Sequence, residues 1–319
     1  MIYGQNFDSL PVATNFTVNS GNPVSVNQLG SANQVTYSLA DPFDFAYPVL
    51  PTGGVGGFGL SNSMPGWYGW GQISTKFAVQ QGDQSTGGTI DFGTLSTNLV
   101  TGEANRALGL LSTSTTGPSA FGLKLVNNTG VTLSSINLSY LGEVWRQQPR
   151  SNSLVFGYYV DAAATAAFSP TNSSLTLVPA LDVNFNTNAG GLLILDGSQS
   201  SNQVSVAVSN LPIADWTANS ALWLVWQQLD SQGSAQGLAI DNLAFSAGFF
   251  KPVLNISLSN GGVVVSWPAS VDGFALQQNS RVSAPTGWST VTQPIVVVGS
   301  SNTVTVPTTS SATFYRLIR

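Results

Sequence analysis

Histidine and cysteine are both absent from this chain of 319 residues. Without histidine there can be no Ser-His-Asp triad or Cys-His dyad, and the usual ligands of zinc enzymes are missing. Without cysteine there is no disulfide, so stability must come from hydrophobic cores, which a chain of this length can bury. Because Gly-x-Ser-x-Gly and phosphate-binding glycine motifs are missing too, we predict that the protein is not an enzyme. The alternative left open is a glycosidase, which needs two carboxylates flanking the bond; Glu103, Glu143 and scattered aspartates are the only candidates.

Charged residues are scarce as well. Only 7% of the residues are charged and the net charge is -5, against a typical charged fraction of about 25%. The nine basic residues are scattered, which argues against nucleic acid and anionic membrane surfaces as partners. No run approaches the ~20 apolar residues of a membrane span. A surface built from Ser, Thr, Asn, Gln and Gly indicates an extracellular protein, and we expect that a signal peptide has been removed.

Short β-branched or alternating runs recur along the chain, separated by Gly, Asn, Ser and Asp clusters, and no stretch sustains a helical period. This pattern predicts an all-β protein. The clearest strands are expected at 121–126, 131–141, 154–160, 192–195, 204–208, 221–226 and 238–245. Asn127-Asn128-Thr129-Gly130 between two of them is typical of a hairpin turn. In the strand at 221–226, Trp223 faces one side while Trp226 faces the other, and at least one of them should be structural.

A domain boundary is predicted near Phe249-Phe250-Lys251-Pro252, after which a compact run of short strands begins again. Residues 1–248 then form a large antiparallel β-sandwich of the jelly-roll type. Residues 252–319, with turn signals every ~8–12 residues, form a small immunoglobulin- or fibronectin-like sandwich. Trp267 and Trp288 are expected in the core of this second domain.

Residues 46–71 contain too much glycine and proline for regular strands, so we predict a long surface loop. Three aromatic residues lie in it: Trp67, Tyr68 and Trp70. Flat exposed rings stack on the apolar faces of sugars, so these three are the predicted ligand-binding residues, with a polysaccharide or cell-surface glycan as partner. The competing interpretation is that they plug the edge of the sandwich or contact a neighbouring subunit.

Calcium is the metal that the composition permits, because hard cations take carboxylate and carbonyl oxygens. Asp8 on the opening strand and Asp241 on the closing strand can lie close together if the termini pair. Asp8, Asp241 and Asn242 are therefore the predicted calcium ligands, against the alternative that they only cap turns. Glu143 is expected to form an ion pair that braces its strand, and Arg106 and Arg146 to make specific buried hydrogen bonds.

The C-terminal segment contains Gly261-Gly262-Val263-Val264-Val265-Ser266-Trp267-Pro268 and closes with Phe314-Tyr315-Arg316-Leu317. It resembles a small sandwich module at the C-terminus of secreted proteins of Verrucomicrobia-type bacteria. The resemblance covers most of residues 252–319 and implies export and an accessory module rather than a reaction.

The N-terminal region resembles an exported bacterial jelly-roll domain of the carbohydrate-binding-module type. The matching pieces are Gln5-Asn6-Phe7-Asp8-Ser9-Leu10-Pro11, Asn105-Arg106-Ala107-Leu108-Gly109, Leu141-Gly142-Glu143-Val144-Trp145-Arg146 and Gly237-Leu238-Ala239-Ile240-Asp241-Asn242-Leu243. The resemblance bears more on fold than on function.

Two hypotheses follow. In the first, this is a secreted or cell-surface protein that binds glycans or mediates adhesion through the aromatic residues. In the second, it is a self-assembling structural subunit, a homo-oligomer or filament in a surface layer or matrix. A mean hydropathy of +0.16 with 7% charge favours the second, because little charge repulsion keeps monomers apart. The aromatic segment and the resemblance favour the first.

Overall fold

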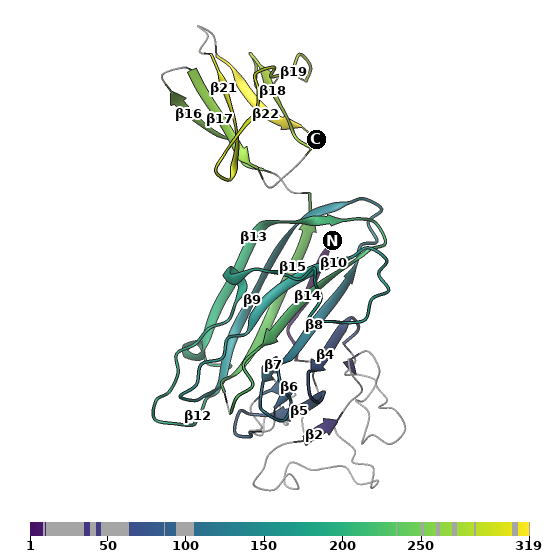
Figure 1. The fold of residues 1–319 in the computed structure, drawn as a ribbon, viewed down its shortest axis with the longest axis vertical. Helices are drawn as coiled ribbons and strands as arrows, with labels where there is room; N and C mark the ends of the chain where they lie inside the picture. Colours follow the sequence, from purple (N-terminus) through teal and green to yellow (C-terminus); the bar gives the residue numbers. More distant parts are fainter. Residues whose placement is uncertain are drawn as a thin grey trace. The chain divides into compact units, whose positions relative to one another are not determined.

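The computed structural model shows an all-β protein (Figure 1). The chain folds into two compact units, Met1–Gly248 and Phe249–Arg319. The predicted fold class, a large β-sandwich and a small one, is confirmed. No helix in the described residues is long and apolar enough to cross a membrane. The structure describes residues 1–8, 10, 35–38, 43–45, 64–85, 87–93, 105–233, 235–249, 252–259, 262–269, 273–283, 285–307 and 312–318.

A nine-stranded sheet forms one layer of the large unit, with the order β12-β9-β15-β7-β6-β5-β2 among the described strands. Two more strands join it, because β1 pairs with β15 and β13 pairs with β9. All its pairs are antiparallel except β5 with β6. Its strands are β1 (Ile2–Gln5), β2 (Val35–Ser38), β5 (Lys76–Gln80), β6 (Gly88–Phe92), β7 (Ala107–Leu111), β9 (Leu133–Gln147), β12 (Leu193–Ile194), β13 (Gln203–Trp216) and β15 (Gly237–Gly248).

A six-stranded sheet forms the other layer, with the order β11-β10-β14-β8-β4-β3 among the described strands. Its strands are β3 (Phe43–Asp44), β4 (Trp67–Gly71), β8 (Ser119–Val126), β10 (Val155–Asp161), β11 (Thr176–Leu177) and β14 (Ala221–Gln228). Strand β14 is buried along its whole length, because one of its faces meets the other sheet and a second apolar cluster covers the opposite face.

The main core lies between the two sheets. It collects alternate residues from both, among them Leu108 and Leu110 of β7, Ile240 of β15, and Leu224 and Trp226 of β14. This period of two is the one that the sequence shows, since successive side chains of a strand point to opposite faces. The predicted opposition of Trp223 and Trp226 is confirmed, because Trp226 belongs to the main core and Trp223 to the cluster on the outer face.

The turn at 127–130 differs from the prediction. It does not close a hairpin, because β8 belongs to the six-stranded sheet and β9 to the nine-stranded one. The buried Asn127 side chain holds this crossing by donating hydrogen bonds to the Val131 and Trp216 carbonyls at 2.7 and 2.8 Å. Gly130 adopts φ +77°, as a turn residue of either connection would. A local turn signal therefore predicted the reversal but not the sheet to which the chain returns.

The small unit is built from a four-stranded and a three-stranded sheet among the described strands. The first runs β16-β17-β21-β20, comprising Asn255–Ser259, Gly262–Pro268, Ser301–Val306 and Val296–Val298. The second runs β19-β18-β22, comprising Ser289–Thr290, Ala275–Asn279 and Phe314–Ile318. Trp267 is in its core. Trp288 was also expected there but is half-buried, with the Arg316 guanidinium 4.3 Å from its ring centroid.

Candidate functional site

The predicted loop at 46–71 is wrong for its last five residues. Residues 46–63 lie outside the described residues, whereas Trp67–Gly71 form strand β4, paired with β8 on one side and β3 on the other. Its glycines serve close packing: a Cβ on Gly71 would lie 2.3 Å from the Ser74 carbonyl oxygen. Strand glycine often marks such a close approach of another backbone segment. The three predicted aromatic residues therefore lie on a strand, which divides them between two faces.

Trp67 points into the main core and is 0% exposed. Its ring stacks on Trp226 with centroids 5.8 Å apart and meets Phe7 edge-on at 5.1 Å. The indole nitrogen donates a hydrogen bond to the Tyr3 hydroxyl at 2.7 Å. A ligand cannot reach this ring, so the prediction that Trp67 binds a sugar is corrected: the residue joins the core of the sandwich.

Tyr68 and Trp70 point the opposite way, onto the outer face of the six-stranded sheet, and both are half-buried. They pack against a cluster of Ala120, Tyr159, Phe168, Trp223 and Val225. The Tyr68 ring is 5.1 Å from Trp223 and 6.3 Å from Phe168. Their ligand-binding role stays a prediction. Both rings are partly exposed on strand β4 and pack against other aromatic rings of the same face.

The registers of the neighbouring strands define what lies beside these rings. Ala120 of β8 is opposite Trp70 on one side and opposite Gln227 of β14 on the other. Directly paired residues project from the same face of a sheet. Trp70, a small alanine and the Gln227 amide therefore stand in one row across three strands. Gln227 is only 6% exposed and Ala120 is 0% exposed, so in this row the half-buried ring of Trp70 is the group that a sugar can reach, by stacking.

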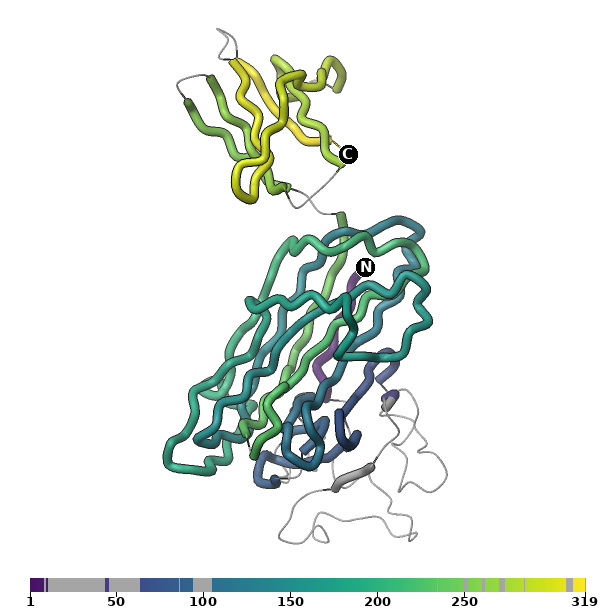
Figure 2. The backbone as a smooth tube through the Cα atoms, viewed as in Figure 1, coloured from purple at the N-terminus to yellow at the C-terminus, as the bar shows by residue number. Residues whose placement is uncertain are grey.

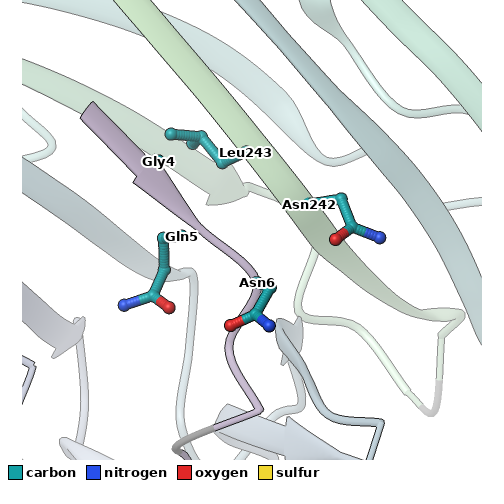
Figure 3. A pocket seen from close by; sticks show the side chains of 5 residues that line it. All are labelled: Gly4, Gln5, Asn6, Asn242 and Leu243. Carbon is teal, nitrogen blue, oxygen red and sulfur yellow. The ribbon is translucent and has the colours of Figure 1, made fainter. Parts of the chain in front are cut away.

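A second candidate region is an open pocket of about 330 Å³ between β1 and β15, lined by Gly4, Gln5, Asn6, Asn242 and Leu243. The two strands run side by side in Figure 2, with Gln5 paired to Leu243. Figure 3 shows the side-chain amides of Asn6 and Asn242 extending from these neighbouring strands. The backbone is irregular at this point, with a register shift between Asp241 and Ala244 and positive φ at Asn242. Bulges and such strained residues occur often at functional sites.

The predicted calcium ligands gather at this second region. Burial is the main cause that raises the pKa of Asp241 to about 6, and the negative charge of Asp8 contributes to the rise. The Asp241 carboxylate accepts hydrogen bonds from the backbone and side-chain nitrogens of Asn242, at 2.6 and 3.0 Å. Asp8 accepts from Asn6 at 2.7 Å and from the Arg106 backbone at 3.1 Å. Within the described ranges, no three acidic, histidine or cysteine side chains form a group able to hold a metal. Calcium stays a prediction.

Glu143 is fully buried and makes hydrogen bonds in place of the predicted ion pair. Its two carboxylate oxygens accept from the Trp145 indole at 2.9 Å and from the Gln203 amide at 2.8 Å. Burial, followed by the negative charges of Asp241 and Asp196, raises the pKa of Glu143 to about 7 despite these bonds. Burying a carboxylate disfavours its charged form.

The two arginines do make the specific buried hydrogen bonds that were predicted. Arg106 donates to the Asp91 carboxylate at 2.7 Å and to the Asp91 carbonyl at 2.9 Å. Arg146 donates to the Gly82 and Gln84 carbonyls at 3.0 and 3.2 Å. The Arg106 guanidinium therefore ties the start of β7 to strand β6, and that of Arg146 ties β9 to the loop after β5.

Sequence reasoning missed Gln5, Asn6, Gln227 and Phe168. The amides carried no signal, because this chain is rich in amide side chains and only pairing shows which of them converge. Phe168 had one usable signal: it is the single large ring in the Ala-rich segment after β10, where no strand pattern accounts for it.

Comparisons with known proteins identify no family. No protein-family description matches the chain, and no curated protein matches it. The enzymatically active domain of bacteriophage CBA120 tailspike protein 4 aligns with 57% of this chain at 9% identity and a TM-score of 0.28. An arabinose-bound MgGH51 α-L-arabinofuranosidase aligns with 77% at 10% identity and a TM-score of 0.30. The aligned parts cover only 19% and 32% of those two chains.

These two structures contradict the prediction that the protein is not an enzyme, since chains that align with this one are enzymes. The prediction rested on missing histidine, cysteine and sequence motifs, none of which glycoside hydrolysis requires. Glycoside hydrolysis needs two carboxyl groups that flank the scissile bond, and residues with carboxyl groups are present in this chain. The exclusion is withdrawn; similarity at this level assigns no reaction to the chain.

Proposed function

We propose that this is an extracellular protein that binds polysaccharides on the outer face of its six-stranded sheet, through Tyr68 and Trp70. The observation that carries the proposal is the position of these two rings, half-buried on one face of β4 and packed on the cluster around Trp223. A rigid backing fixes their orientation before a ligand arrives, which lowers the entropy cost of binding.

The spacing of the pair fits a chain-like ligand. Residues two apart on one strand face are separated by about 7 Å, so neighbouring sugar units of one polysaccharide chain can contact both rings. Tyr68 pairs with Gly122 of β8, and Lys124 lies two residues further along the same strand. Its ammonium nitrogen is 5.3 Å from the centroid of the Trp223 ring, which places a cation beside the cluster.

The test is affinity electrophoresis of Trp70→Ala and Tyr68→Ala in native gels that contain soluble xylan, arabinan, dextran or a mixed-linkage β-glucan. Trp288→Ala is the matched control, because Trp288 is a half-buried tryptophan of the small unit. We expect at least one polysaccharide to retard the native protein, and retardation to be lost in the two β4 variants and kept in the control. Equal retardation of all four proteins would overturn the proposal.

Calcium belongs to the proposal as a structural ligand of Asp8, Asp241 and Asn242. It is supported by the pairing of β1 with β15, which brings the segments that carry Asp8 and Asp241 together, and by the effect of the Asp8 charge on Asp241. Calcium at 1 mM should raise the melting temperature, and Asp8→Asn should remove that rise. A melting temperature that does not respond to calcium or to chelator would end this part of the proposal.

Self-assembly is the second candidate, and the small unit supplies the observation that favours it. Its four-stranded sheet has two apolar edge strands: Val296, Val297 and Val298 of β20 are 54–62% exposed, and Leu258 of β16 is 85% exposed. Edge strands without charge pair readily with other strands. The occupant would be the edge strand of a second copy. Light scattering across a concentration series tests it: a constant mass near 33.2 kDa would refute self-assembly, and loss of a larger species in Val297→Lys would support it.

A further inference from the structure

Three small residues lie close together on the outer face of the six-stranded sheet. Ala120 and Gly122 of β8 and Gly157 of β10 all lie on this face, beside Tyr68, Trp70 and Val225. The chain itself covers these small residues. A Cβ on Gly122 would lie 2.3 Å from the Phe168 ring, and one on Gly157 would lie 3.0 Å from Leu175. Phe168 and Leu175 both come from the segment between β10 and β11, residues 162–175.

Trp223 lies beneath this segment with an unused hydrogen-bonding group. Its ring is 0% exposed and stacks on Phe168 with centroids 5.5 Å apart at 29°. Its indole nitrogen is buried without a hydrogen-bond partner among the described residues. Within the part of the chain that the structure describes, Trp226 in the main core has an unpaired indole nitrogen too. What distinguishes Trp223 is therefore its place directly under segment 162–175, where an acceptor from outside can reach its N–H once the segment moves.

Segment 162–175 is attached to the sheet by few polar contacts. Its backbone-to-backbone hydrogen bonds are all local, from Ala164 to Asp161, from Asn172 to Ser169 and from Leu175 to Asn172. Two polar contacts reach the sheet beyond Asp161: Lys124 Nζ donates to the Ala164 carbonyl at 2.8 Å, and the Ser169 N–H donates to the Tyr159 hydroxyl at 3.3 Å.

The first part of the segment is exposed and is bonded mainly to Asp161, whose carboxylate accepts hydrogen bonds from the Ala163 and Ala166 N–H groups at 3.2 and 2.8 Å. Ala162, Ala163, Thr165, Ala166 and Ala167 are all exposed, and Ala164 adopts φ +55°, a conformation that is strained for alanine. Displacing the segment breaks no strand ladder, so it can open without unfolding the sheet.

We propose that residues 162–175 form a lid over the second half of the glycan site, and that a sugar ring replaces Phe168 on Trp223 when the lid opens. The lid-open site then runs from Trp70 and Tyr68 to Trp223, whose indole N–H bonds a ligand hydroxyl. This inference rests on the proposed function for its ligand, but the opening of the lid can be measured without one.

Binding is tested with Phe168→Ala against the polysaccharide that retards the native protein most strongly. A site that must open first binds more weakly by the fraction of open protein. Removing the ring that fills it should therefore strengthen binding about 5- to 10-fold, as measured by isothermal titration calorimetry. Phe314→Ala, which removes a partly exposed phenylalanine of the small unit, should leave binding unchanged. Unchanged or weaker binding by a folded Phe168→Ala variant would overturn the proposal.

Lid opening is tested on the ligand-free native protein by hydrogen exchange of the indole N–H groups, observed by ¹⁵N NMR. Trp223→Phe and Trp226→Phe identify the two signals, and Trp226 is the control because it is equally buried but faces the main core. We expect the Trp223 N–H to exchange at least 100-fold faster than that of Trp226. Equal exchange rates would show that Phe168 is a permanent core residue. If no polysaccharide binds but the Trp223 indole N–H exchanges fast, the proposed function is refuted while the opening of the lid is supported.

Discussion

The two faces of the six-stranded sheet bury tryptophan equally but by different means. Trp226 and Trp223, both on β14, are each 0% exposed. Trp226 is surrounded by rings held in strands, including Trp67 and Phe121 at 5.8 and 5.3 Å. Trp223 is covered by Phe168 from a segment whose backbone hydrogen bonds are local. Exposure alone therefore does not distinguish a core from a covered surface; the attachment of the covering segment does.

The largest effect is expected at the inner face. Trp226→Ala removes a ring that contacts both layers of the core, so it should lower the free energy of unfolding by about 3–5 kcal/mol. Urea denaturation monitored by circular dichroism measures this. A loss below about 1 kcal/mol, the size of an ordinary surface substitution, would mean that the inner and outer faces are equally easy to open.

A smaller effect is expected where the outer face meets the lid. Gly122→Ala places a methyl group 2.3 Å from the Phe168 ring, and overpacking of this kind costs about 1–3 kcal/mol. Gly157→Ala is the matched control, because its nearest neighbour is the end of the flexible Leu175 side chain at 3.0 Å. Limited proteolysis within 162–175 should be faster in Gly122→Ala than in Gly157→Ala. The reverse order would contradict the assignment of Phe168 as the filling residue.

The outer face of the nine-stranded sheet differs from the two faces of the six-stranded sheet, because it buries carboxyl groups. Burial raises the pKa of Glu143 from 4.5 to about 7 and that of Asp241 from 3.8 to about 6. The folded state holds these protons more tightly than the unfolded chain, so the stability they contribute is complete below about pH 4 and is lost as the pH rises through about 6 to 7.

We therefore expect these two groups to lower the melting temperature between pH 4.5 and 7.5, and Asp241→Asn to flatten the part of the slope near pH 6. Asp230→Asn, at an exposed ion pair with Arg150, is the control and should keep the native slope. Differential scanning fluorimetry at half-unit pH steps is the measurement. A native protein whose melting temperature climbs through this range would refute the raised pKa values.

The smallest effect is expected at Trp70. Because this ring is half-buried on the outer face, Trp70→Ala should change the free energy of unfolding by less than about 1 kcal/mol, well below Trp226→Ala. Urea denaturation of the two variants side by side tests the contrast. A loss at Trp70 as large as that at Trp226 would make it a core residue and weaken its role as a ligand platform.

Most of the strands were predictable, because alternation of apolar and polar residues survives in the sequence wherever a strand has one covered face. The segments at 121–126, 221–226 and 238–245 all fall within strands β8, β14 and β15. Strand β4 was not predictable by the same rule. Its glycines read as loop residues, whereas Gly69 and Gly71 are small because the Phe45 ring, the Thr89 side chain and the Ser74 backbone approach them closely.

The candidate site was predictable in its residue types more than in its geometry. Asp8 and Asp241 were expected to meet because terminal strands of such sandwiches pair, and β1 does pair with β15. Of the three predicted ligand-binding rings, Tyr68 and Trp70 are half-buried on the outer face, whereas Trp67 is fully buried. Once β4 was taken for a loop, no alternation could assign its rings to different faces.

The sequence by itself determined that the protein is all-β, that its surface carries little charge and that neighbouring residues of each strand face opposite sides. These properties are local, since they depend on residue type and on the period of two. Only the tertiary structure decided which face would be covered and by what. Trp226 packs against the other sheet, whereas Trp223 packs against the segment between β10 and β11. That choice depends on pairing between strands far apart in the chain, which short-range patterns do not encode.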